Sequence, residues 1–195
     1  IPIVAVNPMP ERALIRFTEP QDIVQMATLG STEITSEFVH IRIGGDLAFL
    51  KGIMKVMFER EAQGEAVLDH AFLAEHTLGV DALREDALAQ DWAEIVRVSG
   101  IAEVQIRRCA DIYIRSQATV ISYGMGLTQH QYGSRLLLQE ANLPLPRGMS
   151  GKPRAGIGLT RGPSHATGHR PPRIVATPTP ASLDRVSEAL PSLPP

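Results

Sequence analysis

The hydrophobic residues of the chain form short continuous runs separated by segments in which apolar residues recur at helical spacing. The runs at 1–6 and 118–123 predict buried strands, and Phe38-Val-His-Ile-Arg-Ile43 predicts another short strand. Strands that are apolar on both faces are typical of parallel sheets covered by helices. The chain is therefore expected to place helices against short, buried strands.

Helical spacing predicts long helices at 47–60, 102–116 and 131–143. The apolar face predicted for the second of them consists of Ile106, Cys109, Ala110 and Tyr113. The acidic, alanine-rich segment 62–98 predicts three short helices, near 69–76, 81–89 and 91–97. Aspartates occupy the expected N-cap positions of the helix at 47–60 and of the three short helices, namely Asp46, Asp69, Asp81 and Asp91.

The alternation of strands with helices predicts an α/β fold, a three-layer sandwich with a mostly parallel sheet. Residues 8–37 show little periodicity and are expected to form a long loop with short helical turns. Pro144 and Pro146 should end the helix that precedes them. Residues 147–173 are then expected to be irregular, and residues 181–190 to form a last helix.

Composition divides the chain more sharply than its average suggests. The chain has 195 residues, 44% of them hydrophobic, and a formal net charge of −2. Residues 144–195, called here the basic tail, hold 11 of the 15 prolines and carry seven Lys or Arg against two Asp or Glu. The other residues carry 12 Lys or Arg against 19 Asp or Glu. An acidic α/β body joined to a basic, Pro/Gly-rich tail is the expected organisation.

Several protein classes are excluded by the same numbers. The small net charge gives no reason to expect nucleic acid or an anionic membrane surface as a partner. No apolar run reaches the roughly 18–20 residues of a membrane span. The sequence also shows no secretory leader. Because Cys109 is the single cysteine, a disulfide framework and a four-cysteine metal site are excluded. A cytoplasmic, reducing setting is expected.

Three glycine-containing segments could bind a ligand. Gly44-Gly45-Asp46 and Gly124-Met-Gly-Leu-Thr-Gln-His130 each follow a predicted strand, where α/β folds bind ligands. The third segment, 147–165, interleaves Arg and Lys with Gly, a pattern that suits phosphate. Ordinary turn glycines and a solvated basic loop remain alternatives from residue types alone.

Taken together and in this order, four motifs resemble the molybdopterin-dependent oxidoreductases, and most of all their formate-dehydrogenase-like alpha subunits. The motifs are Ile43-Gly-Gly-Asp-Leu-Ala-Phe-Leu-Lys-Gly52, Val67-Leu-Asp-His-Ala-Phe-Leu-Ala-Glu-His-Thr77, Gly124-Met-Gly-Leu-Thr-Gln-His130, and Gly151-Lys-Pro-Arg-Ala-Gly156 with Arg161-Gly162. The resemblance covers almost the whole chain. It identifies the chain as an internal fragment of such a subunit.

The resemblance implies a cofactor and a substrate class. The cofactor would be a molybdenum ion held by two molybdopterin guanine dinucleotides, and the substrate a small anion such as formate. Arg161 would orient that anion. The implied cofactor-binding residues are Asn7, Gly44, Gly45, Asp46, Gly124, Met125, Gly126, Thr128, Gln129, Gly162, Ser164 and His165. Residues 1–146 would form the pterin-binding portion, and residues 147–195 the active-site loop and an extension.

The metal-ligating residue and the cysteines of the 4Fe-4S cluster lie upstream of this region in the family. We therefore expect no catalysis by this chain alone, and the rest of the parent polypeptide as its partner. Two alternatives are a truncated, non-catalytic remnant and a protein-interaction module. In the second, the acidic helices at 62–98 would form a surface and the basic tail would dock a partner.

Overall fold

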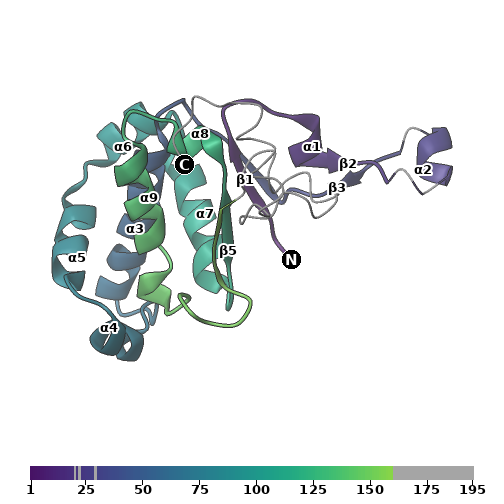
Figure 1. The fold of residues 1–195 in the computed structure, drawn as a ribbon. Helices are drawn as coiled ribbons and strands as arrows, with labels where there is room; N and C mark the ends of the chain where they lie inside the picture. Colours follow the sequence, from purple (N-terminus) through teal and green to yellow (C-terminus); the bar gives the residue numbers. More distant parts are fainter. Residues whose placement is uncertain (20, 22, 29, 160–195) are drawn as a thin grey trace, which may run out of the picture.

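A computed structural model describes residues 1–19, 21, 23–28 and 30–159 of the chain (Figure 1). Its strands are β1 (Val4–Asn7), β2 (Arg16–Phe17), β3 (Thr32–Glu33), β4 (Glu37–His40), β5 (Val120–Tyr123) and β6 (Gly156–Leu159). Its helices are α1 (Arg12–Ile15), α2 (Ile23–Thr28), α3 (Asp46–Ala62), α4 (His70–His76), α5 (Val80–Ala89), α6 (Trp92–Ser99), α7 (Glu103–Arg115), α8 (Met125–Thr128) and α9 (Gly133–Asn142), with the 3₁₀ turn η1 (Leu145–Arg147).

The described strands pair as three two-stranded sheets. β1 pairs with β4 and β5 with β6, both in parallel, whereas β2 and β3 form an antiparallel hairpin. Helices combined with parallel strand pairs are an α/β arrangement, as the sequence predicts. The described pairs do not join into one sheet, so the three-layer sandwich stays a prediction.

Figure 1 shows the helices α3, α5, α6, α7 and α9 gathered into one body, with β1 and β5 along its side. The β2–β3 hairpin and α2 extend away from that body. Within the part of the chain that the structure covers, no helix is both long enough and apolar enough to cross a membrane.

α3 is the central helix, in contact with α5, α6, α7 and α9. A helix surrounded by others must be apolar on most sides, and its buried residues include Ile53, Met54, Met57 and Phe58. Gly52 allows the close approach of two neighbours. A Cβ atom there would lie 2.9 Å from Cγ2 of Ile106 on α7.

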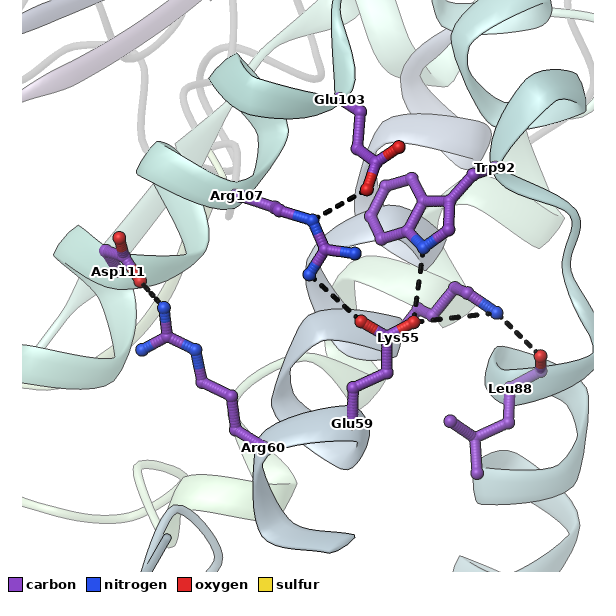
Figure 2. Close-up of polar contacts among 8 residues, drawn as sticks. All are labelled: Lys55, Glu59, Arg60, Leu88, Trp92, Glu103, Arg107 and Asp111. Carbon is purple, nitrogen blue, oxygen red and sulfur yellow. Dashed lines mark hydrogen bonds and ion pairs between the residues drawn. The ribbon is translucent and has the colours of Figure 1, made fainter. Parts of the chain in front are cut away.

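Charged side chains join the outer helices to α3 (Figure 2). Glu59 of α3 accepts hydrogen bonds from the Trp92 indole at 3.1 Å and from Arg107 at 3.0 Å. Arg107 also bonds Glu103 at 2.7 Å. Lys55 donates to the carbonyl of Leu88 at 2.7 Å, which ties α5 to the same helix.

Two of the four predicted N-caps are confirmed. Asp69 accepts from the amide of Phe72 at 3.0 Å, and Asp91 from that of Glu94 at 3.3 Å. The prediction for Asp81 is wrong, since α5 begins one residue earlier, after Gly79. Gly79 has a φ of 77°, a conformation that glycine adopts without strain.

The prediction for Asp46 is wrong as well. The N-cap of α3 is Gly45, and Asp46 lies in the first helical turn. A carboxylate in that position still favours the positive end of the helix dipole.

α9 ends at Asn142, two residues before Pro144, as the prolines predict. The hydroxyl of Tyr113 donates to the carbonyl of Leu143 at 2.9 Å and satisfies this helix end. The expectation of an irregular segment from residue 147 is wrong for 156–159, which form β6. The last predicted helix, 181–190, lies outside the described residues.

Candidate functional site

A cavity of about 960 Å³ lies between the two parallel strand pairs and α3. Its walls are mostly apolar and come from β1, α3, α7 and β5, with residues such as Val4, Phe49, Ile112 and Ile121. Its volume is at the upper end of the usual range for ligand pockets. The cavity is therefore large enough for a ligand of nucleotide size.

Three separate predicted segments meet at this cavity. Asn7 ends β1, Gly44 precedes α3 and Asp46 begins it, and Gly124 and Gly126 follow β5. All five residues line the cavity. Strand ends and helix starts are where α/β folds place ligands. The structure thus brings together residues that are up to 119 positions apart in the sequence.

The glycines at this site have different structural roles. Gly44 has a φ of 84°, and a Cβ there would lie 3.0 Å from Cε1 of His130. A Cβ on Gly126 would meet nothing within 4 Å, so this glycine borders open space. Gly45 does not line the cavity, and its Cβ would lie 2.6 Å from Cα of Ser99. Gly45 is needed for packing against the end of α6.

Three further predicted residues that the structure describes are not brought to the cavity. Met125, Thr128 and Gln129 belong to α8 or follow it and are absent from the lining. Four further predicted residues lie outside the described part of the chain, namely Arg161, Gly162, Ser164 and His165.

Glu140, which the sequence analysis missed, is the most unusual residue of the lining. Its exposed fraction is 2%, and its Oε2 atom has no hydrogen-bond partner among the described residues. Burial, and secondarily the charge of Asp46, raises the pKa of this carboxyl group to about 7. Helical spacing from Leu136 and Leu143, both buried, placed Glu140 on the apolar stripe of α9 and could have revealed it.

Asp46 and His130 complete an ionisable group of residues at the same end. Burial raises the pKa of Asp46, while a backbone hydrogen bond and the charge of His130 oppose that shift. His130 was part of the predicted motif but was not assigned to the site. The end of the cavity near α3 and α9 therefore presents two carboxyl groups and one imidazole.

The described part of the basic segment, residues 147–159, brings one cationic side chain to the cavity lining. Arg147 donates to the carbonyls of Val67 at 2.8 Å and Ser116 at 2.9 Å, and Lys152 to that of Gln117 at 2.7 Å. Arg154, with a φ of 66°, is the one Lys or Arg among the described lining residues. A phosphate group in the described cavity would thus meet a single cationic side chain.

The described residues offer no group of three or more His, Cys, Asp or Glu arranged to hold a metal ion. Cys109 lines the cavity, but burial raises the pKa of its thiol to about 12, which makes it inert. The donor set instead suits an organic ring. Apolar walls would contact its faces, and the carboxyl groups would accept hydrogen bonds from its N–H groups.

Comparison with known proteins shows homology to oxidoreductases. The chain is 42% identical over 198 residues to the protein YdeP of Escherichia coli O6:H1, covering 99% of this chain and 26% of that protein. It is 39% identical over 169 residues to an uncharacterized oxidoreductase of Mycobacterium tuberculosis H37Rv, covering 86% and 22%. It is 26% identical over 138 residues to formate dehydrogenase H of Escherichia coli K12, covering 71% and 19%.

The chain spans about a quarter of the length of the first two of these relatives. No protein-family model matches it. Among solved structures, the acetylene hydratase of Pelobacter acetylenicus has a similar fold, with a TM-score of 0.61 at 13% identity over 78% of this chain and 18% of that one. The fold likeness agrees with the α/β arrangement of the chain, and the sequence homology relates the chain to oxidoreductases.

Proposed function

We propose that the chain is part of the catalytic subunit of a molybdopterin-dependent, formate-dehydrogenase-like oxidoreductase, and that its cavity holds part of a molybdopterin guanine dinucleotide. The observation that carries the proposal is the meeting of Asn7, the Gly44–Asp46 turn and the Gly124–Gly126 turn at one cavity. These segments were assigned to the cofactor from motifs that are distant in the sequence. Homology to oxidoreductases supports the same function.

The organic part of this cofactor fits the residues present. Gly126 leaves space beside α8, and the unpartnered Oε2 of Glu140 offers an acceptor to a ring N–H group. The described residues hold no group of three or more His, Cys, Asp or Glu that could bind a metal ion, and we place the metal's ligand elsewhere in the parent polypeptide as part of this proposal. When bound, the cofactor would supply two-electron redox chemistry at molybdenum.

The part of this chain would be to bind and orient. The apolar walls would exclude water from the ring, and Arg154 would neutralise one negative charge of the ligand. Arg161 remains our proposal for the residue that holds a small anionic substrate such as formate, since its planar cation suits a carboxylate. Catalysis would require the rest of the parent polypeptide, including the segment with the 4Fe-4S cluster.

Calorimetric titration of the 195-residue chain with guanosine monophosphate tests the proposal. We expect saturable binding that is lost in Gly126→Val, because a Cβ at this position meets nothing within 4 Å and the new side chain would occupy space at the cavity. Ala82→Val is the matched control, since Ala82 is an exposed residue of α5 and does not line the cavity. No binding by the unmodified chain would favour the non-catalytic remnant.

A further inference from the structure

The buried carboxyl group of Glu140 lacks a partner at a place where the chain leaves room for one. It projects from α9 into the lining of the cavity, its exposed fraction is 2%, and its Oε2 atom is unbonded among the described residues. Buried polar atoms without partners are rare in folded proteins, and each one calls for an explanation. A ligand that bonds this oxygen would provide one.

The groups around Glu140 determine whether such a ligand should carry hydrogen-bond donors or acceptors. Asp46, on the neighbouring helix α3, is half-buried at the same end of the cavity, and its negative charge acts on Glu140. A hydrogen-bond acceptor on the ligand could bond only the one proton shared by these carboxyl groups. Paired N–H donors on the ligand could bond up to four carboxylate oxygens of Glu140 and Asp46. Donor groups of a ring are therefore the better match.

We propose that Glu140 recognises the paired N–H donors of a 2-amino-4-oxopyrimidine edge, and that binding of this ring releases one proton from Glu140 to the solvent. The edge is shared by guanine and pterin rings. In the free chain below pH 7 the carboxyl group mostly keeps its proton. On binding, the O–H bond breaks, the proton passes to the buffer, and the carboxylate accepts two N–H hydrogen bonds. The inference rests on the proposed function, because it assigns this edge to the same cavity.

The pKa of about 7 supports the proton count. At pH 6 most of the free chain would hold the proton, and at pH 8 little of it would. Because the ring binds the ionised form, its affinity should rise roughly eightfold from pH 5.5 to pH 6.5 and level off above pH 7.

Three other ionisable groups near Glu140 lie on α7 and η1. On α7, burial raises the pKa of the Cys109 thiol to about 12, and the Tyr113 hydroxyl is bonded to Leu143. Arg147 of η1 is bonded to the carbonyls of Val67 and Ser116.

Tyr123, His130 and Arg154 also line the cavity. The charge of His130 acts on Asp46 at the same end of the cavity. His130 therefore needs its own variant in the test.

Titration calorimetry in two buffers of different ionisation enthalpy measures the proton released on binding. The probes are guanosine monophosphate, 6-hydroxymethylpterin and, as a control without the 2-amino group, inosine monophosphate. We expect release of close to one proton at pH 6, and weaker binding of inosine monophosphate. Binding of one or both of the first two probes identifies which ring the site takes.

Glu140→Gln should remove the proton release and the eightfold change with pH, whereas His130→Gln should retain both. Should Glu140→Gln fail to fold, Asp46→Asn serves instead, since loss of that charge should reduce the proton released at pH 6.5. Unchanged proton release in Glu140→Gln, or loss of proton release only in His130→Gln, would overturn the inference. In either case, loss of binding in Gly126→Val would still support the proposed function. No binding of either ring compound would overturn both.

Discussion

The guanidinium carbon of Arg107 lies 4.6 Å from the centroid of the Trp92 ring, which places a cation over an aromatic face between α6 and α7. The same guanidinium bonds Glu59 on α3, and Glu59 also accepts from the Trp92 indole (Figure 2). Three helices thus meet through one cation, one ring and one carboxylate. These contacts hold α3 and α7 in position relative to each other, and both helices supply much of the cavity wall.

Replacing Arg107 by alanine should lower the free energy of unfolding by about 1–2 kcal/mol, since the cation–π contact and a partly buried ion pair are lost together. Urea denaturation monitored by Trp92 fluorescence measures the change. Arg97→Ala is the matched control, because the exposed side chain of Arg97 pairs with Glu94 of its own helix and not with another described helix. An equal or larger loss in Arg97→Ala would contradict the prediction.

Asp69→Ala should lower the free energy of unfolding by about 1 kcal/mol, because the first turn of α4 loses its side-chain cap. Asp81→Ala should have a smaller effect, since Asp81 is not the N-cap of α5 and its pairing with Arg84 is exposed. Thermal unfolding of the two variants compares the positions directly. If Asp81→Ala were the more damaging change, the start assigned to α5 would be wrong.

Gly52→Val should destabilise the fold by about 1–3 kcal/mol, because its Cβ would be only 2.9 Å from a methyl group of Ile106 and 3.2 Å from one of Ile95. Gly126→Val adds the same side chain in open space and serves as the control. Chemical denaturation of both variants gives the difference. Equal stability of the two would show that α3 and α7 are less closely packed than these distances indicate.

The stability of the unmodified chain should decline as the pH rises through about 7, because Glu140 has a higher pKa in the folded state than its ordinary value of 4.5. The folded state then holds a proton that the unfolded state has released, so this contribution is fully present below pH 4.5. Glu140→Gln should remove this decline and should be more stable than the unmodified chain at pH 8, by about 3 kcal/mol at most. Urea denaturation at pH 6 and pH 8 measures both, and a decline that persists in Glu140→Gln would assign it to another group.

Much of the local structure was predictable because it depends on neighbours in the sequence. Leu136 and Leu143 mark the buried stripe of α9, Asp69 and Asp91 cap their helices, and Pro144 ends α9. Such features depend on helical spacing and on hydrogen bonds within one turn. For the same reason the glycine turns at the strand ends could be placed from the order of residues alone.

Features that depend on distant parts of the chain were missed. Gly156–Leu159 is glycine-rich and reads as a loop, but pairing with β5 makes it a strand. Gly45 reads as a phosphate turn, but the close approach of Ser99 determines its use. Glu140 is a charged residue at an apolar position of α9, and the packing of α9 on α3 shows that its carboxyl group is buried there.

The bonds of Arg147 and Lys152 give the basic tail a consequence for the helix that precedes β5. Ser116 is the C-cap of α7 and Gln117 follows it, so both cations meet carbonyl groups at the negative end of that helix dipole. The two side chains thus satisfy carbonyl groups at the end of α7, more than 30 residues earlier in the sequence. A polyanionic partner that drew these two side chains away would loosen the last turn of α7, and with it the wall formed by Cys109 and Tyr113. Docking at this point and an intact cavity would therefore oppose each other.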